Sequence, residues 1–267
     1  MPYFKNDNIN VLFIHIPKTG GTSVENYFSS KFNIKLNSKS LFTLGKIYHN
    51  TNINSNLQHV TYNQIIEYNN LFNIDFNNIK IFTIVRNPYE RVISDLFYLK
   101  LINVKTSNNE VCNIISKYLI SNSYDNHTIP QYKFITDDNK VLIPNIKILN
   151  TENLNKGMHD LGYNDFNIID NKNSNKLNYY NYLNNKSIEI INDFYHFDFI
   201  LFNYKKIDIN ANNDKIRNMN RIRNINKNKI MNKIKIMNKI NKINKIRNIN
   251  RIRNNNRIGN INRIIKF

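Results

Sequence analysis

The sequence is poor in cysteine, glycine and proline, and it contains no tryptophan. Cys112 is the one cysteine in 267 residues, so no intramolecular disulfide can form, which suits a reducing compartment. No apolar run reaches the roughly 18–20 residues that a membrane-spanning helix needs. The first ten residues, MPYFKNDNIN, lack the apolar core of a signal peptide. These absences favour a soluble, cytoplasmic protein.

Acidic residues are nearly absent from one end of the chain. Residues 1–210 carry 21 Lys and Arg against 18 Asp and Glu, whereas residues 211–267 carry 17 against one, Asp214. Most of the formal net charge of +19 therefore lies in the C-terminal tail, residues 211–267. A nearly neutral body does not have the basic surface expected of a nucleic-acid-binding domain.

The tail repeats a short pattern of Asn, Lys, Arg and Ile. Isoleucine recurs every third residue from 240 to 252, and that period drifts around a helix without building an apolar face. We expect residues 208–267 to be a disordered, low-complexity segment. Two interpretations stay open. One is a simple-sequence expansion with weak polyanion affinity. The other is a selected nucleic-acid-binding tail, which the lack of interleaved aromatic residues disfavours.

Strand-like and helix-like segments alternate in residues 1–207, which we expect to form one domain. Apolar runs typical of buried strands lie at 10–16, 79–85 and 144–150. Helical patterns lie at 23–32, 58–69, 89–102 and 187–199. This alternation predicts an α/β, P-loop-like three-layer fold with a central parallel sheet flanked by helices. Ligands of such sheets bind at the carboxyl ends of the strands.

The segment HIPKTGGTS, residues 15–23, has the composition of a phosphate-binding loop. It leaves a predicted strand and enters a predicted helix, where successive backbone N–H groups bind anions. Its two glycines permit positive φ and a close approach to a ligand. A Walker A loop places its lysine after the last glycine, whereas here the lysine precedes both, which disfavours ordinary ATP hydrolysis. The candidate anion-binding residues are Lys18, Thr19, Gly20, Gly21, Thr22 and Ser23.

The segment RNPYERVISDLFY, residues 86–98, supplies a second candidate anion site. Arg86 follows the second predicted strand, where a guanidinium can fork onto a phosphate. Ser94 lies about two turns into the following helix. Taken alone, Arg86 could form a surface salt bridge and Ser94 could be a small helix residue. Together with the first loop on an adjacent strand, they suit a nucleotide with phosphates at both ends of its ribose.

These two segments resemble the 5′-phosphosulfate-binding loop and the 3′-phosphate-binding motif of sulfotransferases, especially carbohydrate sulfotransferases of the heparan sulfate 2-O-sulfotransferase type. The resemblance covers residues 8–205, with shorter matches at 58–62, 131–134, 151–154 and 194–204. It implies that 3′-phosphoadenosine 5′-phosphosulfate is the sulfuryl donor and binds residues 18–23, Arg86 and Ser94. It also implies that Lys18 stabilises the leaving group and that His59, in a segment similar to the family's GHV segment, is the base.

The resemblance further implies an acceptor that carries a hydroxyl group, with a carbohydrate favoured. Its enzymes usually have a membrane anchor and disulfides, and we expect neither in this chain. We also expect no metal, because Cys112 and the six histidines show no ligand spacing. Two alternatives stay open: an inactive sulfotransferase fold that binds polyanions through its tail, and a P-loop-like nucleotide kinase.

Overall fold

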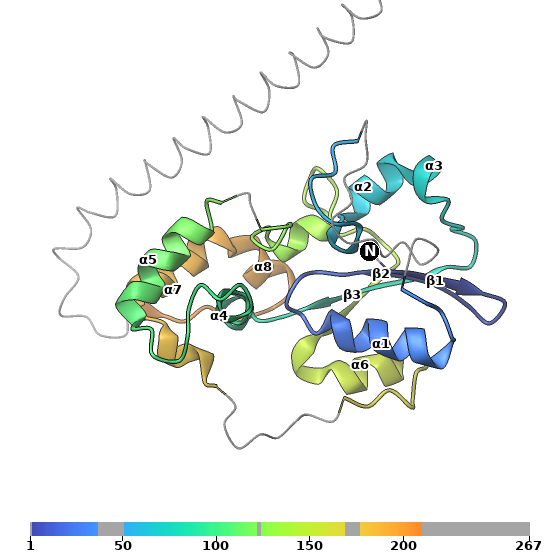
Figure 1. The fold of residues 1–267 in the computed structure, drawn as a ribbon. Coiled ribbons are helices and arrows are strands. Elements are labelled where there is room, and N and C mark those ends of the chain that lie inside the picture. The colour runs from blue at the N-terminus through green and yellow to red at the C-terminus, as the bar shows by residue number, and fades with distance from the viewer. Residues whose placement is uncertain (1, 37–50, 122–123, 169–176, 210–267) are drawn as a thin grey trace, which may run out of the picture. The chain divides into compact units, whose positions relative to one another are not determined.

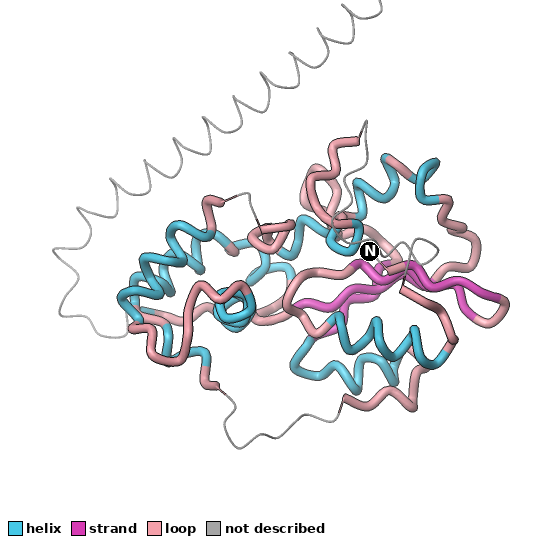
Figure 2. The backbone as a smooth tube through the Cα atoms, viewed as in Figure 1, coloured by secondary structure: helices cyan, strands magenta, loops and turns pink. Residues whose placement is uncertain are grey.

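A four-stranded sheet forms the centre of the fold (Figures 1 and 2). The computed structural model describes residues 2–36, 51–121, 124–168 and 177–209. The strands lie in the order of the chain: β1 (Tyr3–Asn6), β2 (Ile9–Ile14), β3 (Lys80–Val85) and β4 (Ile146–Asn150). The predicted central sheet is therefore confirmed, and its three predicted strands correspond to β2, β3 and β4.

The sheet is mixed, so the prediction of a wholly parallel sheet is wrong at one edge. Strands β2, β3 and β4 pair in parallel, but β1 runs antiparallel to β2, with Asn6 opposite Ile9. Only Asp7 and Asn8 separate the two strands, and a two-residue connection permits no crossover, so β1 must fold back as a hairpin. The parallel pair β2–β3 nevertheless brings the carboxyl ends of both predicted strands to the same edge.

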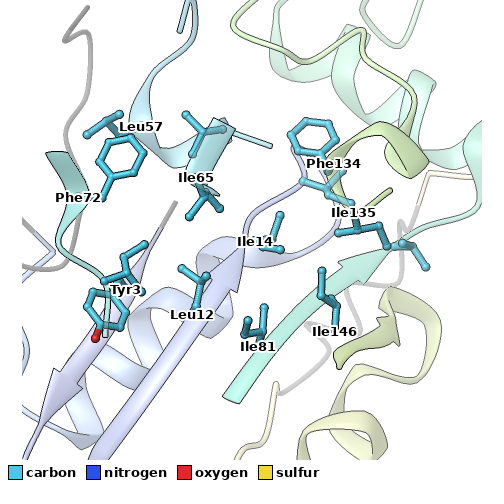
Figure 3. Packing of buried hydrophobic residues seen from close by; sticks show 14 of the residues in the cluster. Tyr3, Leu12, Ile14, Leu57, Ile65, Phe72, Ile81, Phe134, Ile135 and Ile146 are labelled. Carbon is cyan, nitrogen blue, oxygen red and sulfur yellow. The ribbon is translucent and has the colours of Figure 1, made fainter. Parts of the chain in front are cut away.

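Buried side chains alternate between the two faces of the sheet and form one apolar core on each. On one face, Leu12, Ile14, Ile81 and Ile146 pack against Leu57, Ile65, Phe72, Phe134 and Ile135 (Figure 3). On the other face, Val11, Phe13, Phe82 and Ile84 pack against Val24, Phe28, Leu154 and Met158. Full burial of one such side chain contributes about 1.5–3 kcal/mol. Helices thus cover both faces, as the three-layer prediction required.

The helices follow in chain order. They are α1 (Gly21–Lys31), α2 (Tyr62–Glu67), α3 (Asn69–Phe72), α4 (Pro88–Tyr98), α5 (Asn108–Tyr118), α6 (Leu154–Asp160), α7 (Asn185–Phe194) and α8 (His196–Leu201). Short 3-10 turns occupy Leu57–His59, Gln131–Phe134, Thr151–Asn153 and Tyr179–Tyr182. Figure 1 shows α1 and α6 on one side of the sheet and α2 and α3 on the other. Helices α5 and α6 lie outside every predicted helical segment.

The starts of helices α4 and α5 have clear local causes. The Asn87 side chain accepts a hydrogen bond from the Tyr89 amide, and Pro88 occupies the first turn of α4, where its fixed φ is favourable. Ser107 and Glu110 form a capping box that starts α5. The Asn87–Pro88 signal therefore ends β3 and directs the chain immediately into α4.

The chain divides into two units at Ile207, and almost all described residues belong to the first, Met1–Ile207. The expectation of a disordered tail falls almost entirely outside the described residues, which end at position 209. Within the described segments, no helix has both the length and the apolar character needed to cross a membrane.

Candidate active site

The loop between β2 and α1 is built around two left-handed residues. Lys18 has φ of 65° and Gly20 has φ of 92°, and Gly20 forms the N-cap of α1. The buried Thr19 hydroxyl donates to the Ile16 carbonyl at 2.8 Å, so this side chain closes the loop and does not point a free donor outward. The loop that was predicted to bind an anion therefore enters α1 at its N-terminus, with Lys18 half-buried.

The two glycines are required for different reasons. Gly20 adopts the positive φ that the sequence predicts. Gly21 does not have a positive φ; it is required because a Cβ atom there would lie 2.3 Å from Nε2 of His15. The sequence predicts His15 inside the strand at 10–16, but in the structure His15 lies just beyond the end of β2. Its buried ring packs directly against the rest of the loop of residues 15–23, called the donor loop below, and so couples this loop to the histidines described below.

Arg86 lies directly after β3, next to the strand that leads into the first loop, and it contacts that loop. One terminal guanidinium nitrogen donates to the Lys18 carbonyl at 3.4 Å and the other to Glu90 at 3.1 Å. Its buried Nε has no hydrogen-bond partner among the described residues. A buried guanidinium N–H without a partner costs free energy unless a ligand satisfies it, and an anion is the natural acceptor.

On α4, Ser94 lies between Glu90, which pairs with Arg86, and Tyr98, which contacts the Lys18 ammonium. Glu90, Ser94 and Tyr98 are spaced by four residues and share one face of the helix. Arg86 pairs with Glu90 at one end of this stripe, and the Lys18 ammonium sits 4.0 Å from the ring centroid of Tyr98 at the other. The second motif therefore meets the first along a single helix face.

Gln131 binds the backbone of Arg86, and Asp198 in turn binds the backbone of Gln131. The Gln131 side chain accepts from the Arg86 amide and donates to the Arg86 carbonyl, both at 2.9 Å. Asp198 is fully buried and accepts from the backbone amides of Gln131 and Tyr132 at 2.9 and 2.8 Å. Burial raises the pKa of the Asp198 carboxyl to about 6, against the effect of these hydrogen bonds.

Arg91 and Thr151 connect the donor loop to the rest of the site. The buried Arg91 guanidinium donates to the carbonyls of Pro17, Ile129 and His127 at 3.0, 3.1 and 2.8 Å. The Thr151 hydroxyl lies 2.6 Å from the Thr19 carbonyl and 3.1 Å from that of Val85. These side chains bind backbone carbonyls and therefore hold the loop in place.

His59 is paired with a carboxylate. Its Nδ1 lies 2.9 Å from Asp125 Oδ2, and the Asn56 amide and side chain hold the same carboxylate at 2.6 and 2.8 Å. Burial lowers the pKa of His59 to about 4, with the Asp125 hydrogen bond opposing the shift and nearby His15 adding to it. The imidazole is therefore neutral at pH 7. A carboxylate can only accept, so Nδ1 carries the proton and Nε2 carries the lone pair.

Two further imidazole–carboxylate pairs adjoin His59. His15 pairs with buried Glu25 at 2.5 Å, and Gln58 donates to both Glu25 oxygens at 2.9 Å. His127 pairs with buried Asp95 at 2.7 Å. The His59 ring meets those of His15 and His127 edge to face, at centroid distances of 5.3 and 5.1 Å. Three histidines that the sequence scatters thus form one row.

His59, His127 and Asp125 come nearest to a metal-ligand set in the described part of the chain. One nitrogen of each histidine and one Asp125 oxygen all lie within 4.8 Å of one another. Tetrahedral zinc, with bonds of about 2.0–2.1 Å, holds its ligand atoms about 3.4 Å apart, and Nδ1 of each histidine is already hydrogen-bonded to a carboxylate. In this structure each imidazole forms a hydrogen-bonded pair with a carboxylate of its own.

Sequence reasoning missed the carboxylates and the supporting residues of this site. The predicted residues of the two motifs do come together, through Arg86, Lys18 and the α4 stripe. Thr22 is exposed and Ser23 half-buried at the start of α1. The residues that sequence reasoning did not assign to the site are Glu25, Arg91, Asp95, Asp125, His127, Gln131, Thr151 and Asp198. Arg91 and Asp95 lie in the segment 86–98, and Gln131, Thr151 and Asp198 lie in the shorter matching segments, but sequence reasoning assigned none of them a role in the site.

The comparison with protein families agrees with this geometry. The family model described as "Sulfotransferase family" matches residues 1–205, which include every site residue described above. No curated protein and no solved structure matches the chain. The matched region covers most of the chain and includes both segments, 15–23 and 86–98, at the carboxyl edge of the parallel strands. The chain therefore belongs to the sulfotransferase family.

Proposed function

We propose that residues 1–207 form a sulfotransferase that uses 3′-phosphoadenosine 5′-phosphosulfate as donor and a hydroxyl group as acceptor. The observation that carries the proposal is the contact between the two motifs, where Arg86 reaches the Lys18 carbonyl and keeps a buried N–H without a partner among the described residues. Two cations 68 positions apart in the sequence thus share one site. A donor with phosphate groups on both sides of its ribose suits such a pair.

The donor side of the site supplies binding and charge stabilisation. The backbone amides at the start of α1 suit the 5′-phosphate, and Arg86 with Ser94 suits the 3′-phosphate. Burial lowers the pKa of the Lys18 ammonium, which neighbouring Asp95 partly restores. A partly desolvated lysine interacts more strongly with charge that develops on the leaving phosphate than an exposed one would.

The acceptor side supplies the base. The acceptor oxygen forms a bond to sulfur while the bond between sulfur and the bridging phosphate oxygen breaks, and that oxygen keeps the electron pair. The acceptor proton moves to Nε2 of His59, whose Nδ1–H remains on Asp125. The arrangement matches the general-base half of a hydrolase triad. An anionic donor beside His59 would raise the pKa of this imidazole and strengthen it as a base.

Neither alternative has a specific observation in its favour. A nucleotide kinase of the P-loop type needs a lysine after the last glycine, and position 22 is Thr. An inactive polyanion-binding fold would act through the tail, nearly all of which lies outside the described residues. The acceptor belongs to the proposal only as a hydroxyl compound, with a carbohydrate as the favoured class.

Calorimetric titration with 3′-phosphoadenosine 5′-phosphate, 5′-AMP and ATP tests the donor assignment. We expect the bisphosphate to bind at least about 30-fold more tightly than 5′-AMP, since one charge-assisted contact is worth about 2 kcal/mol. Arg86→Gln should remove most of that difference, and Lys117→Gln, at an exposed lysine of α5, should leave it intact. Equal affinity for all three nucleotides, or no binding, would refute the donor assignment.

A further inference from the structure

His127 and His59 present the same chemistry side by side. Each ring has Nδ1 bound to a carboxylate, Asp95 for His127 and Asp125 for His59. In both rings the carboxylate fixes the proton on Nδ1 and leaves the lone pair on Nε2. Neither Nε2 has a hydrogen-bond partner among the described residues. The transfer reaction needs one base, so the second acceptor nitrogen has no role in it.

The two imidazoles are close enough to serve a single ligand. Their ring centroids are 5.1 Å apart, and a nitrogen of each lies within 4.8 Å of the other. Both are largely buried yet keep a small exposed part, 9 % of the His59 side chain and 8 % of the His127 side chain. Two neighbouring acceptor nitrogens complement two neighbouring hydroxyl donors.

His15, the third histidine of the row, is not available for this role. A Cβ atom on Gly21 would lie 2.3 Å from its Nε2, so this nitrogen is packed against the donor loop. Its Nδ1 is held by Glu25 at 2.5 Å. His127 is therefore the partner that could work with His59.

Tyr98 adds an apolar surface next to the polar pair. Its ring is 62 % exposed and stacks on His127 at 5.8 Å between centroids, with planes 11° apart. The Lys18 ammonium lies 4.0 Å from the centroid of the same ring. The exposed Tyr98 ring lies between Lys18, which is proposed to stabilise the leaving group, and the imidazoles. Such an aromatic surface suits the C–H face of a saturated ring.

We propose that His127, held in place by Asp95, determines acceptor specificity by accepting a hydrogen bond from the hydroxyl next to the one that is sulfated. The acceptor is then a cyclic vicinal diol, the pattern that sugar rings carry. His59 takes the proton of the reacting hydroxyl, and His127 fixes its neighbour. This inference rests on the proposed function and specifies the acceptor class of the same site.

The test compares trans-1,2-cyclohexanediol with cyclohexanol as acceptors of label from 35S-labelled donor. A site built to bind a hydroxyl discriminates against the analogue that lacks it. We expect kcat/KM for the diol to exceed that for cyclohexanol by about tenfold or more. In His127→Ala the ratio should fall to about two, the ratio of hydroxyl groups in the two compounds.

Two variants separate this role from a merely structural one. His127→Gln keeps an amide able to accept a hydrogen bond and should recover part of the preference for the diol. His196→Ala, at an exposed histidine of α8, should keep the full preference. Calorimetry with 3′-phosphoadenosine 5′-phosphate should give the same Kd, within about twofold, for all of these chains, because none of the changes touches a donor-binding residue.

The outcomes that overturn the inference differ from those that overturn the proposed function. Equal use of the two alcohols, retention of the preference in His127→Ala, or bisphosphate binding without transfer to the diol would each refute the role of His127. The first two results would leave the sulfotransferase proposal standing. Absence of bisphosphate binding would refute the donor assignment itself, and the inference would fall with it.

Discussion

Substitution of Gly21 by alanine is the sharpest test of how the donor loop is held. The new Cβ atom would lie 2.3 Å from Nε2, 2.4 Å from Cδ2 and 2.7 Å from Cε1 of His15. The ring cannot move aside cheaply, because Glu25 and Gln58 hold it and it is 4 % exposed. Overpacking costs about 1–3 kcal/mol, and disturbing a buried hydrogen-bonded pair adds about 1–3 kcal/mol. We expect the free energy of unfolding to fall by about 2–6 kcal/mol.

Urea denaturation of four chains measures this effect: the unmodified protein, Gly21→Ala, His15→Ala and the double variant. If the clash with the ring is the cause, alanine at position 21 should cost less than about 0.5 kcal/mol once His15 is alanine, which is a coupling of about 2 kcal/mol or more. Gly157→Ala is the matched control, because its Cβ would lie 3.1 Å from Cδ2 and 3.4 Å from Cβ and Cδ1 of Leu149, with no contact as short as those at Gly21. An equal cost of Gly21→Ala in both backgrounds would refute this account of the loop.

Three further predictions follow from the buried polar groups and the tail. The pKa of His59 is lowered to about 4, so acidification from about pH 6.5 to 4 should destabilise the fold through His59 by roughly 3 kcal/mol. The pKa of Asp198 is raised to about 6, so the same acidification should stabilise the fold through Asp198 by roughly 3 kcal/mol. Urea denaturation should therefore show nearly constant stability for the unmodified chain and a loss of roughly 3 kcal/mol for Asp198→Asn; a flat profile in that variant would contradict the shifts. Gln131→Leu should weaken calorimetric binding of 3′-phosphoadenosine 5′-phosphate about tenfold, because the Arg86 backbone loses two hydrogen bonds, and unchanged binding would exclude a positioning role. A chain ending at residue 207 should stay soluble and bind the same nucleotide unchanged, and loss of soluble protein would show that the tail supports the fold.

The strands and helices of the two motifs, β2 with α1 and β3 with α4, could be predicted because their signals lie in neighbouring residues. The apolar runs of β2 and β3 lead directly into the glycine turn before α1 and the Asn87–Pro88 turn before α4, so each motif carries its own strand and helix signals. Helix α5 also carries a local start signal, the capping box of Ser107 and Glu110. Strand β1 is four residues long and could be recognised only through its hairpin with β2.

The row of imidazole–carboxylate pairs could not be predicted, because its partners are distant in sequence. Asp125 lies 66 positions from His59, and Asp95 lies 32 positions from His127. Asp125 has φ of 47°, a left-handed turn conformation that many asparagines of this chain also adopt, so no local pattern distinguishes it. Only the packing of α4 against the loop around His127, held by Arg91, brings these groups together.

Transfer of 35S-labelled sulfate from 3′-phosphoadenosine 5′-phosphosulfate to a hydroxyl acceptor tests the central claim most directly. The unmodified chain should label the acceptor, His59→Ala should bind the donor nucleotide but transfer at least about 100-fold more slowly, and Lys18→Ala should lose a similar factor. Donor binding without label transfer to any hydroxyl compound, or transfer by His59→Ala at the rate of the unmodified chain, would contradict the mechanism.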